Sequence, residues 1–188
     1  QELFDRCILQ VNAVANHLNT AAALIAEIDV DATFAATARR DGSIRPNMIE
    51  SPECDLTGAR HPVLDRLLGA EFVPVDVKLG GSEPSLALVT GPNMAGKSTA
   101  IRTAALLTLL AHAGAYVPAA SATIGRCDRI LTRIGASDEL HAGRSTFMVE
   151  MTETASILHA ATPHSFVVLD EIGRGTSTFD GLSLAWSI

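Results

Sequence analysis

Residues 91–98, with the sequence GPNMAGKS, have the types and spacing of a loop that holds the phosphates of a nucleotide. Gly91 and Gly96 allow the backbone to turn tightly and to bring its N–H groups close to phosphate oxygens. Lys97 supplies a positive charge for the β- and γ-phosphates, and the Ser98 hydroxyl is a ligand for Mg²⁺. An apolar run at 86–89 and a helical periodicity from Lys97 onward predict the strand–loop–helix setting that this chemistry requires.

A second group of reactive side chains follows the apolar run at 166–169, where Asp170 and Glu171 stand next to each other. An acid at the carboxyl end of a strand can hold Mg²⁺ beside a phosphate loop, directly or through water. Glu171 is then suited to polarise the water that attacks the γ-phosphate. Without the loop, such a strand end would be interpreted as a solvated turn. With it, the pair predicts a Mg²⁺-dependent P-loop ATPase in which Lys97 and Glu171 are catalytic and Ser98 and Asp170 bind the metal.

Ser145 follows a glycine and begins a predicted helix over 145–161, and it admits two interpretations. The start of a helix attracts anions, and in ATPases that dimerise across two nucleotides such a start approaches the ATP of the other subunit. Alternatively, Ser145 or Thr146 only caps the helix. The buried stripe of this helix is expected to consist of Met148, Met151, Ala155 and Leu158.

The polar stretch 173–180, directly after the acids, suits a loop that carries signals between subunits or an ordinary surface loop. None of the six histidines has metal-ligand spacing, and His61 is expected to make structural hydrogen bonds in its Arg–His–Pro turn.

The elements that must position these groups follow from the apolar periodicity. Residues 3–40 predict a helical region, with an interruption at 29–31. Glycines and prolines over 41–60 indicate turns and short strands, and mark a soft boundary. Beyond it, short apolar runs alternate with helical periods, at 86–89, 98–112, 130–134, 145–161 and 166–169. This alternation predicts an α/β fold with a mostly parallel sheet flanked by helices. The expected domains are a helical segment at 1–40 and a P-loop NTPase domain at 41–188.

Composition limits the partners and the compartment. The chain has 188 residues and a net charge of −7, whereas contact with the DNA backbone requires an excess of Lys and Arg. Three separated cysteines indicate neither a disulfide framework nor a zinc site, which favours a reducing cytoplasm. The apolar stretch 104–113 is shorter than the roughly 20 residues of a membrane span. The chain begins with Gln1 and stops at Ile188 inside an apolar run, so we expect a piece of a larger protein.

Four stretches together are closely similar to the MutS family of DNA mismatch repair ATPases, a branch of the ABC-type P-loop proteins. They are GARHP at 58–62, TGPNM at 90–94, STFMVEMTE at 145–153 and DEIGRGTST at 170–178. The last two are far more specific than the phosphate loop alone. The resemblance is strong over 58–188 and weaker over 1–40, which looks like the lower end of the family's long lever helix.

The resemblance implies residue roles at one nucleotide site. The residues implied to contact ATP are Gly91, Pro92, Asn93, Met94, Ala95, Gly96, Lys97, Ser98 and Thr99, with Asn93 near the γ-phosphate. Ser145 would reach the ATP of the partner subunit. Phe72 stands where the family stacks an aromatic ring on adenine, although the residues alone would indicate a core position. The family often has glycine at position 95, and Ala95 is expected to be tolerated unless the backbone there needs a positive φ.

The resemblance also implies an activity and partners. The family forms a clamp-shaped homodimer that scans double-stranded DNA for mismatches, and ATP binding and hydrolysis change its state. Mismatched DNA would be bound through domains outside this chain, with a MutL-type repair partner, in the bacterial cytoplasm at the nucleoid and without a membrane. Because the family's switch histidine would lie beyond Ile188, weak or no ATP turnover is expected of residues 1–188 alone. Two alternatives remain: a MutS-related paralogue acting in recombination or on branched DNA, and a non-catalytic nucleotide-dependent interaction module, against which Glu171 argues.

Overall fold

A computed structural model describes residues 1–92, 95–135, 146–173 and 176–188. The chain forms two compact units, Gln1–Ser43 and Ile44–Ile188, and each is described here by itself.

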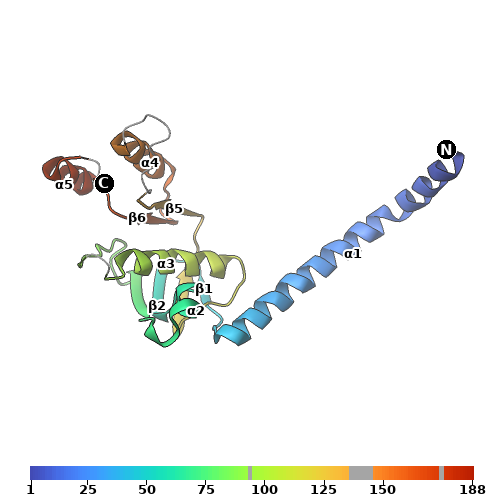
Figure 1. Cartoon of the computed structure of the whole chain (residues 1–188), viewed down its shortest axis with the longest axis horizontal. Helices are drawn as coiled ribbons and strands as arrows, with labels where there is room; N and C mark the ends of the chain where they lie inside the picture. The colour runs from blue at the N-terminus through green and yellow to red at the C-terminus, as the bar shows by residue number, and fades with distance from the viewer. Residues whose placement is uncertain (93–94, 136–145, 174–175) are drawn as a thin grey trace. The chain divides into compact units, whose positions relative to one another are not determined.

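The first unit is one long helix, α1 (Glu2–Asp41), shown in blue in Figure 1. It ends at Gly42, which has a φ of +62° and donates its N–H to the carbonyl of Ala38. The interruption expected at 29–31 is wrong, since the helix continues through these residues. Aspartate and valine lower helix propensity by only tenths of a kcal/mol each, and neither removes a backbone N–H as proline does.

The second unit contains a four-stranded sheet and a two-stranded sheet. The larger sheet has the order β1-β4-β2-β3. Its strands are β1 (Asn47–Ile49), β2 (Glu53–Ala59), β3 (Val75–Gly80) and β4 (Ser121–Gly125). Only β1 and β4 pair in parallel; β2 is antiparallel to both β3 and β4. The short helices α2 (Leu64–Leu68) and η1 (Gly69–Glu71) connect β2 to β3.

The smaller sheet pairs β5 (Arg129–Arg133) with β6 (Ser165–Leu169) in parallel, and the connection between them contains α4 (Thr146–Ala160). The helix α3 (Lys97–His112) contacts β2 of one sheet and β6 of the other, and it lies between the two sheets in Figure 1. The last helix is α5 (Thr178–Ser187). The helices expected at 98–112 and 145–161 and the strands expected at 130–134 and 166–169 are thereby confirmed, within a residue or two at their ends.

The expected mostly parallel sheet is wrong, because the fold is mixed α/β and its larger sheet is mainly antiparallel. The run 86–89 forms no strand, and Leu86 and Leu88 are 84% and 89% exposed. An apolar run favours extended backbone, but strand formation also requires a neighbour that accepts its hydrogen bonds. The strand β2 lies within residues 41–60, where turns and short strands were expected without bounds. Its alternate residues Cys54 and Leu56 are buried, a pattern typical of a sheet with one covered face.

The core of the second unit lies between α3 and the larger sheet. Leu56, Leu107 and Val117 are fully buried there, and Ile124 is 1% exposed. Cys54 belongs to the same cluster, where burial raises the pKa of its thiol to about 11. The thiol is therefore neutral at physiological pH and packs as a small apolar side chain.

Truncating Leu107 to alanine is expected to lower the free energy of unfolding by about 2–5 kcal/mol, because it removes a fully buried side chain and leaves a cavity. Leu109→Ala is the matched control on the same helix, since Leu109 is 54% exposed. Denaturant unfolding followed by circular dichroism measures both. Equal losses for the two variants would contradict the packing of α3 described here.

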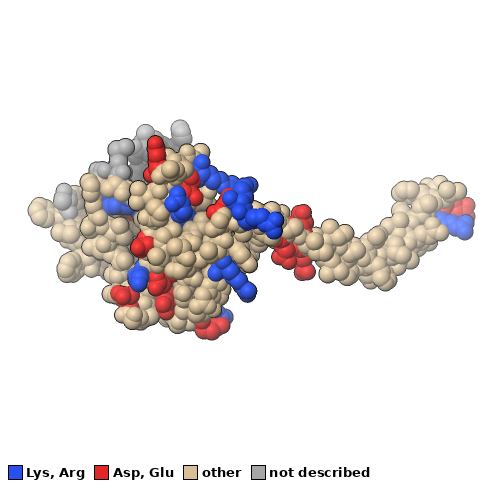
Figure 2. All heavy atoms as spheres, turned by 90° about the horizontal axis from the view of Figure 1, so that it is seen from below, with Lys and Arg blue, Asp and Glu red and all other residues tan. Residues whose placement is uncertain are grey.

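The surface mixes both signs of charge. On the face shown in Figure 2, acidic and basic side chains lie among one another over much of the second unit. Several arginines pair with acids, as Arg60 does with Asp65 and Arg133 with Glu153. Across the described ranges, none of the helices combines the length and apolarity needed to cross a membrane.

Candidate functional site

The ammonium group of Lys97 contacts the backbone just before α3. The Lys97 Nζ donates hydrogen bonds to the carbonyls of Gly91 at 2.7 Å and Pro92 at 2.8 Å. Gly96 caps the helix with a φ of +86°, a conformation that side chains rarely adopt, so the glycine at this position has a structural reason. Two backbone carbonyls before α3 therefore hold the Lys97 ammonium group. Its present partners are neutral carbonyls, which phosphate oxygens would replace with a stronger, charge-assisted contact.

The first turn of α3 carries Lys97, Ser98 and Thr99, where helix N–H groups are left without intrahelical acceptors. Partial positive charge and free donors at this end suit the binding of phosphate. Within the described part of the chain, Glu171 is the one non-glycine residue with a positive φ. Ala95 thus lacks the positive φ that would make a methyl group unfavourable there, and its tolerance stays a prediction.

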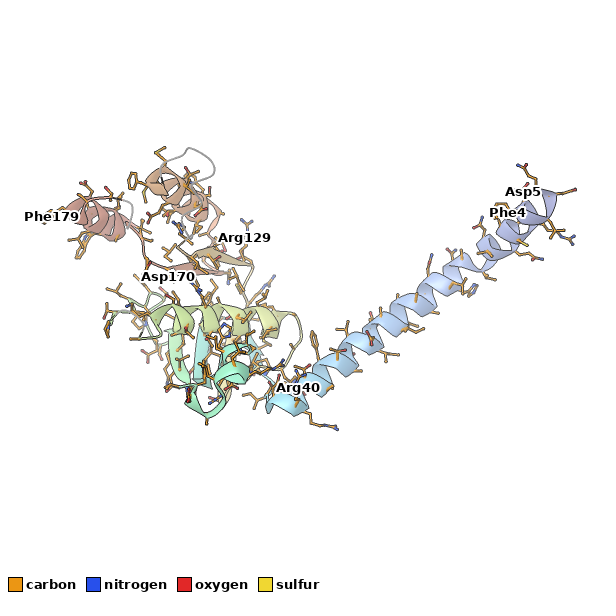
Figure 3. All side chains as sticks on the ribbon, viewed as in Figure 1. Phe4, Asp5, Arg40, Arg129, Asp170 and Phe179 are labelled. Carbon is orange, nitrogen blue, oxygen red and sulfur yellow. The ribbon has the colours of Figure 1, made fainter. Side chains whose placement is uncertain are left out.

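Asp170 is brought to the same helix by β6. Its backbone N–H donates to the carbonyl of Arg133 at 2.8 Å, which extends the β5–β6 pairing by one residue. Its carboxylate Oδ2 lies 3.4 Å from Arg102 Nη2 on α3. Ser98 and Arg102 are four residues apart and so share one face of the helix. Figure 3 shows Asp170 between the end of β6 and α3. Asp170 therefore contacts the helix whose first turn carries Ser98.

Arg102 was not identified from the sequence. Its guanidinium pairs with the carboxylate that is expected to bind Mg²⁺, and the two side chains are 46% and 11% exposed. The carboxylate of Asp170 thus attracts a cation beside the helix that follows the phosphate loop. Carboxylate oxygens are also ligands that divalent metal ions prefer. The signal available in the sequence was the spacing of four residues between Ser98 and a basic residue.

Glu171 lies at the carboxyl ends of the parallel strands β5 and β6. A Cβ atom built on Gly135, two residues after β5, would be 3.7 Å from Glu171 Oε2. The backbone of Glu171 has a φ of +58°, which is strained for a residue with a side chain. Such strain persists where neighbouring structure enforces it, and it is concentrated at functional sites. The carboxyl ends of parallel strands are also where α/β proteins bind ligands.

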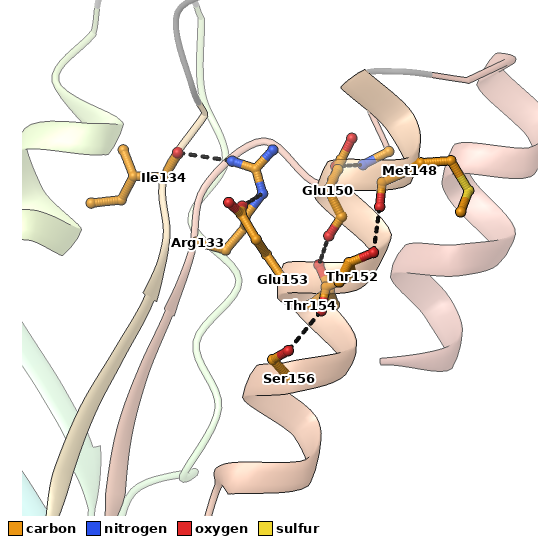
Figure 4. Close-up of polar contacts among 9 residues, drawn as sticks. Arg133, Ile134, Met148, Glu150, Thr152, Glu153, Thr154 and Ser156 are labelled. Atoms are coloured by element: carbon orange, nitrogen blue, oxygen red, sulfur yellow. Dashed lines mark hydrogen bonds and ion pairs between the residues drawn. The ribbon is translucent and has the colours of Figure 1, made fainter. Parts of the chain in front are cut away.

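The buried face of α4 differs from the expected stripe. Met148 and Leu158 are 59% and 51% exposed, so that prediction is wrong. Glu150, Thr154 and Ile157 are buried instead. The periodicity of apolar residues failed here because the covered face is partly polar: Glu150 and the neighbouring Glu153 interact with backbone and side chains at the ends of the two parallel strands (Figure 4).

Phe72 is buried, at 6% exposure, and the guanidinium carbon of Arg60 lies 5.3 Å from its ring centroid. Arg60 is held by Asp65, to which its Nε donates at 2.6 Å. One face of the ring is therefore covered by a cation, a favourable contact with the aromatic π-system. This arrangement is that of a packed side chain, and stacking of Phe72 on adenine stays a prediction.

His61 has the structural role expected of it. Its Nδ1 accepts hydrogen bonds from the backbone N–H groups of Val63 at 3.2 Å and Leu64 at 3.4 Å, at the start of α2. These bonds stabilise the turn that leads into α2.

Four of the predicted site features lie outside the described residues: Asn93, Met94, Ser145 and residues 174–175 of the polar loop. Among the residues that are described, no group of three or more His, Cys, Asp and Glu side chains could hold a metal ion.

Comparison with known proteins agrees with the motifs. The family described as MutS domain V matches residues 87–188. The DNA mismatch repair protein MutS of Myxococcus xanthus is 53% identical over 190 residues, covering 100% of this chain and 21% of that protein. The MutS proteins of Solibacter usitatus and Symbiobacterium thermophilum are 52% and 54% identical, each over 100% of this chain and 22% of their own length.

The chain thus spans about a fifth of the length of the curated relatives it matches. The matched region contains the phosphate loop, α3, both acids and α4, which are the parts that form the candidate site. This chain therefore belongs to the MutS family of DNA mismatch repair proteins.

Proposed function

We propose that this chain is the ATP-binding and ATP-hydrolysing core of a DNA mismatch recognition protein, in which the nucleotide state controls the movement of a clamp on DNA. The observation that carries the proposal is the contact between Asp170 and Arg102 at 3.4 Å. It joins the acidic end of β6 to the helix that follows the phosphate loop. Phosphate-binding groups and metal- and water-directing acids thus belong to one region, as hydrolysis requires.

Each residue has a defined task in this proposal. The ammonium of Lys97 leaves its carbonyl partners for the β- and γ-phosphates, and backbone N–H groups of the loop and of the first turn of α3 bind phosphate oxygens. Ser98 and Asp170 hold Mg²⁺, which when bound neutralises charge on the phosphates. Glu171 orients and polarises the attacking water. Phe72 contributes to the adenine pocket.

A charge argument limits what this chain does with DNA. Its net charge is −7, and the arginines at the site are paired with acids. Tight binding to the DNA backbone needs unpaired Lys and Arg in excess. We infer that mismatched duplex is bound by other parts of the mismatch repair protein. By the same family resemblance, the protein works as a homodimer with Ser145 near the ATP of the partner subunit, recruits a MutL-type partner and acts at the bacterial nucleoid in the cytoplasm.

The proposal is tested with the complete protein that the gene encodes. ATP hydrolysis is expected to require Mg²⁺, and binding to a duplex with one mismatch is expected to be tighter than binding to the matched duplex. Steady-state phosphate release and fluorescence anisotropy of labelled duplexes measure the two. Equal affinity for both duplexes in every nucleotide state would favour the paralogue that acts on branched DNA. Nucleotide binding without any turnover would favour the non-catalytic module.

A further inference from the structure

A buried carboxylate on α4 contacts the loop that follows the two acids. Glu150 is 3% exposed, and its Oε1 accepts a hydrogen bond from the backbone N–H of Gly173 at 2.5 Å. A carboxylate is costly to bury unless a donor compensates for the lost water. The N–H of Gly173 supplies such a donor. Figure 4 shows Glu150 on the side of α4 that faces the end of β5.

Gly173 is held from a second direction. A Cβ atom at this residue would lie 2.7 Å from the Cα of Gly181 in α5, and its φ is +80°. The backbone of Gly173 is therefore in contact with both α4 and α5. Only glycine combines this backbone conformation with so close an approach.

Glu171 lies between two fixed points of the backbone. Before it, the N–H of Asp170 is bonded to Arg133 of β5; after it, the N–H of Gly173 is bonded to Glu150 of α4. Glu171 itself has the strained φ of +58°. A strained conformation is maintained only when surrounding contacts enforce it. The bond between Glu150 and the N–H of Gly173 is one contact that holds the backbone next to Glu171.

A second link connects α4 to the same strand end. The side chain of Arg133, 8% exposed, forms an ion pair with Glu153 at 2.9 Å, and its Nη1 donates to the carbonyl of Ile134 at 2.8 Å. The helix is thus attached to the ends of both strands that carry the site. A displacement of α4 would move the Glu150 carboxylate, which accepts the hydrogen bond from the Gly173 N–H. The backbone that positions Glu171 would move with it.

From these contacts we propose that Glu150 is a positioning residue for Glu171: it fixes the backbone of residues 171–173 and thereby the direction of the catalytic carboxylate. The proposal rests on the proposed ATPase function. It assigns Glu150 no contact with nucleotide, so its loss should slow hydrolysis without weakening nucleotide binding.

The test uses two variants in the complete protein. In Glu150→Ala the Gly173 N–H loses its acceptor, and in Glu150→Gln an amide oxygen of the same reach replaces it. Single-turnover ATP hydrolysis gives the rate of the chemical step, and titration with a non-hydrolysable ATP analogue gives Kd. Glu150→Ala is expected to slow hydrolysis about 100-fold, as misplacement of a catalytic group by about 1 Å does, with Kd changed less than about threefold. Glu150→Gln should recover most of the rate. Thr152→Ala, an exposed position on the same helix, is the control and should behave as wild type.

A double variant separates positioning from general stability. In a Glu171→Gln background the carboxylate to be positioned is gone, so Glu150→Ala should slow the residual hydrolysis by less than about threefold. A full and additive loss in that background would overturn the proposal, as would wild-type rates in Glu150→Ala.

If Glu150→Ala fails to fold, Glu150→Asp replaces it, since the shorter acid keeps its charge but does not reach Gly173. Slow hydrolysis with unchanged Kd supports the proposal, and a wild-type rate overturns it. An absence of ATP turnover in the wild-type protein would instead reject the proposed function, which keeps the two failures distinct.

Discussion

Glu171→Gln is expected to lower the rate of ATP hydrolysis about 100- to 10,000-fold, the range that a positioned general base contributes. Glutamine keeps the size of the side chain, while it cannot accept a proton from water. The strained backbone at residue 171 and the contacts that fix it on both sides should be unaffected, because they involve the main chain. Phosphate release under single-turnover conditions measures the effect.

The same variant should bind ATP as the wild-type protein does, because the carboxylate acts on water and not on the phosphates. Removing one negative charge near the γ-phosphate should, if anything, strengthen binding slightly. Glu50→Gln is a control, since this acid is 89% exposed and pairs only with Arg126 at 3.6 Å among its described salt bridges. A Glu171→Gln protein with full turnover would show that another group activates the water.

Lys97→Ala is expected to weaken ATP binding at least about 100-fold, since two charge-assisted hydrogen bonds of about 1.5–3 kcal/mol each become unavailable to the phosphates. In the structure the ammonium donates hydrogen bonds to the carbonyls of Gly91 and Pro92. Its loss therefore also removes the group that holds these two residues. Hydrolysis should fall with the binding. Isothermal titration with ATP in the presence of Mg²⁺ measures the affinity.

Lys78→Ala serves as the matched control for Lys97→Ala. Lys78 is also a lysine on the second unit, but its side chain is 57% exposed and its Nζ is 3.8 Å from Asp55. An exposed pair of this kind contributes little to stability.

The decisive comparison is between the two site variants, Lys97→Ala and Glu171→Gln. Equal loss of ATP affinity in Lys97→Ala and Glu171→Gln would contradict the division of roles into phosphate binding and water activation.

The candidate site shows how far local sequence can predict chemistry. The phosphate loop and the two acids were identified because their functions depend on adjacent residues: a turn with its lysine, and a strand with its terminal acids. The helix α3 and the strands β5 and β6 were also predicted closely, since apolar residues are concentrated within each of them. Backbone conformation and side-chain spacing within one element are local properties, and the sequence expresses them directly.

Arg102 and Glu150 were not identified, and the reason is the same for both. Each acquires its role from a residue far away in the chain. Arg102 pairs with Asp170, directly after β6, and Glu150 accepts a hydrogen bond from Gly173. Nothing in the neighbouring residues distinguishes a buried acid on α4 from a solvated one. The apolar spacing of Met148, Met151 and Leu158 indicated a different face of α4 as the buried one.

The sequence by itself therefore determined which groups are candidates for binding and hydrolysing ATP, and which elements carry most of them. The tertiary structure alone decided which strands pair, that 86–89 stays unpaired among the described residues, and which face of α4 is covered. The physical reason is that hydrogen bonds between strands and the burial of a helix face depend on a partner surface. That surface forms only when segments distant in the sequence pack together. The same packing brings Glu150 to the backbone beside Glu171.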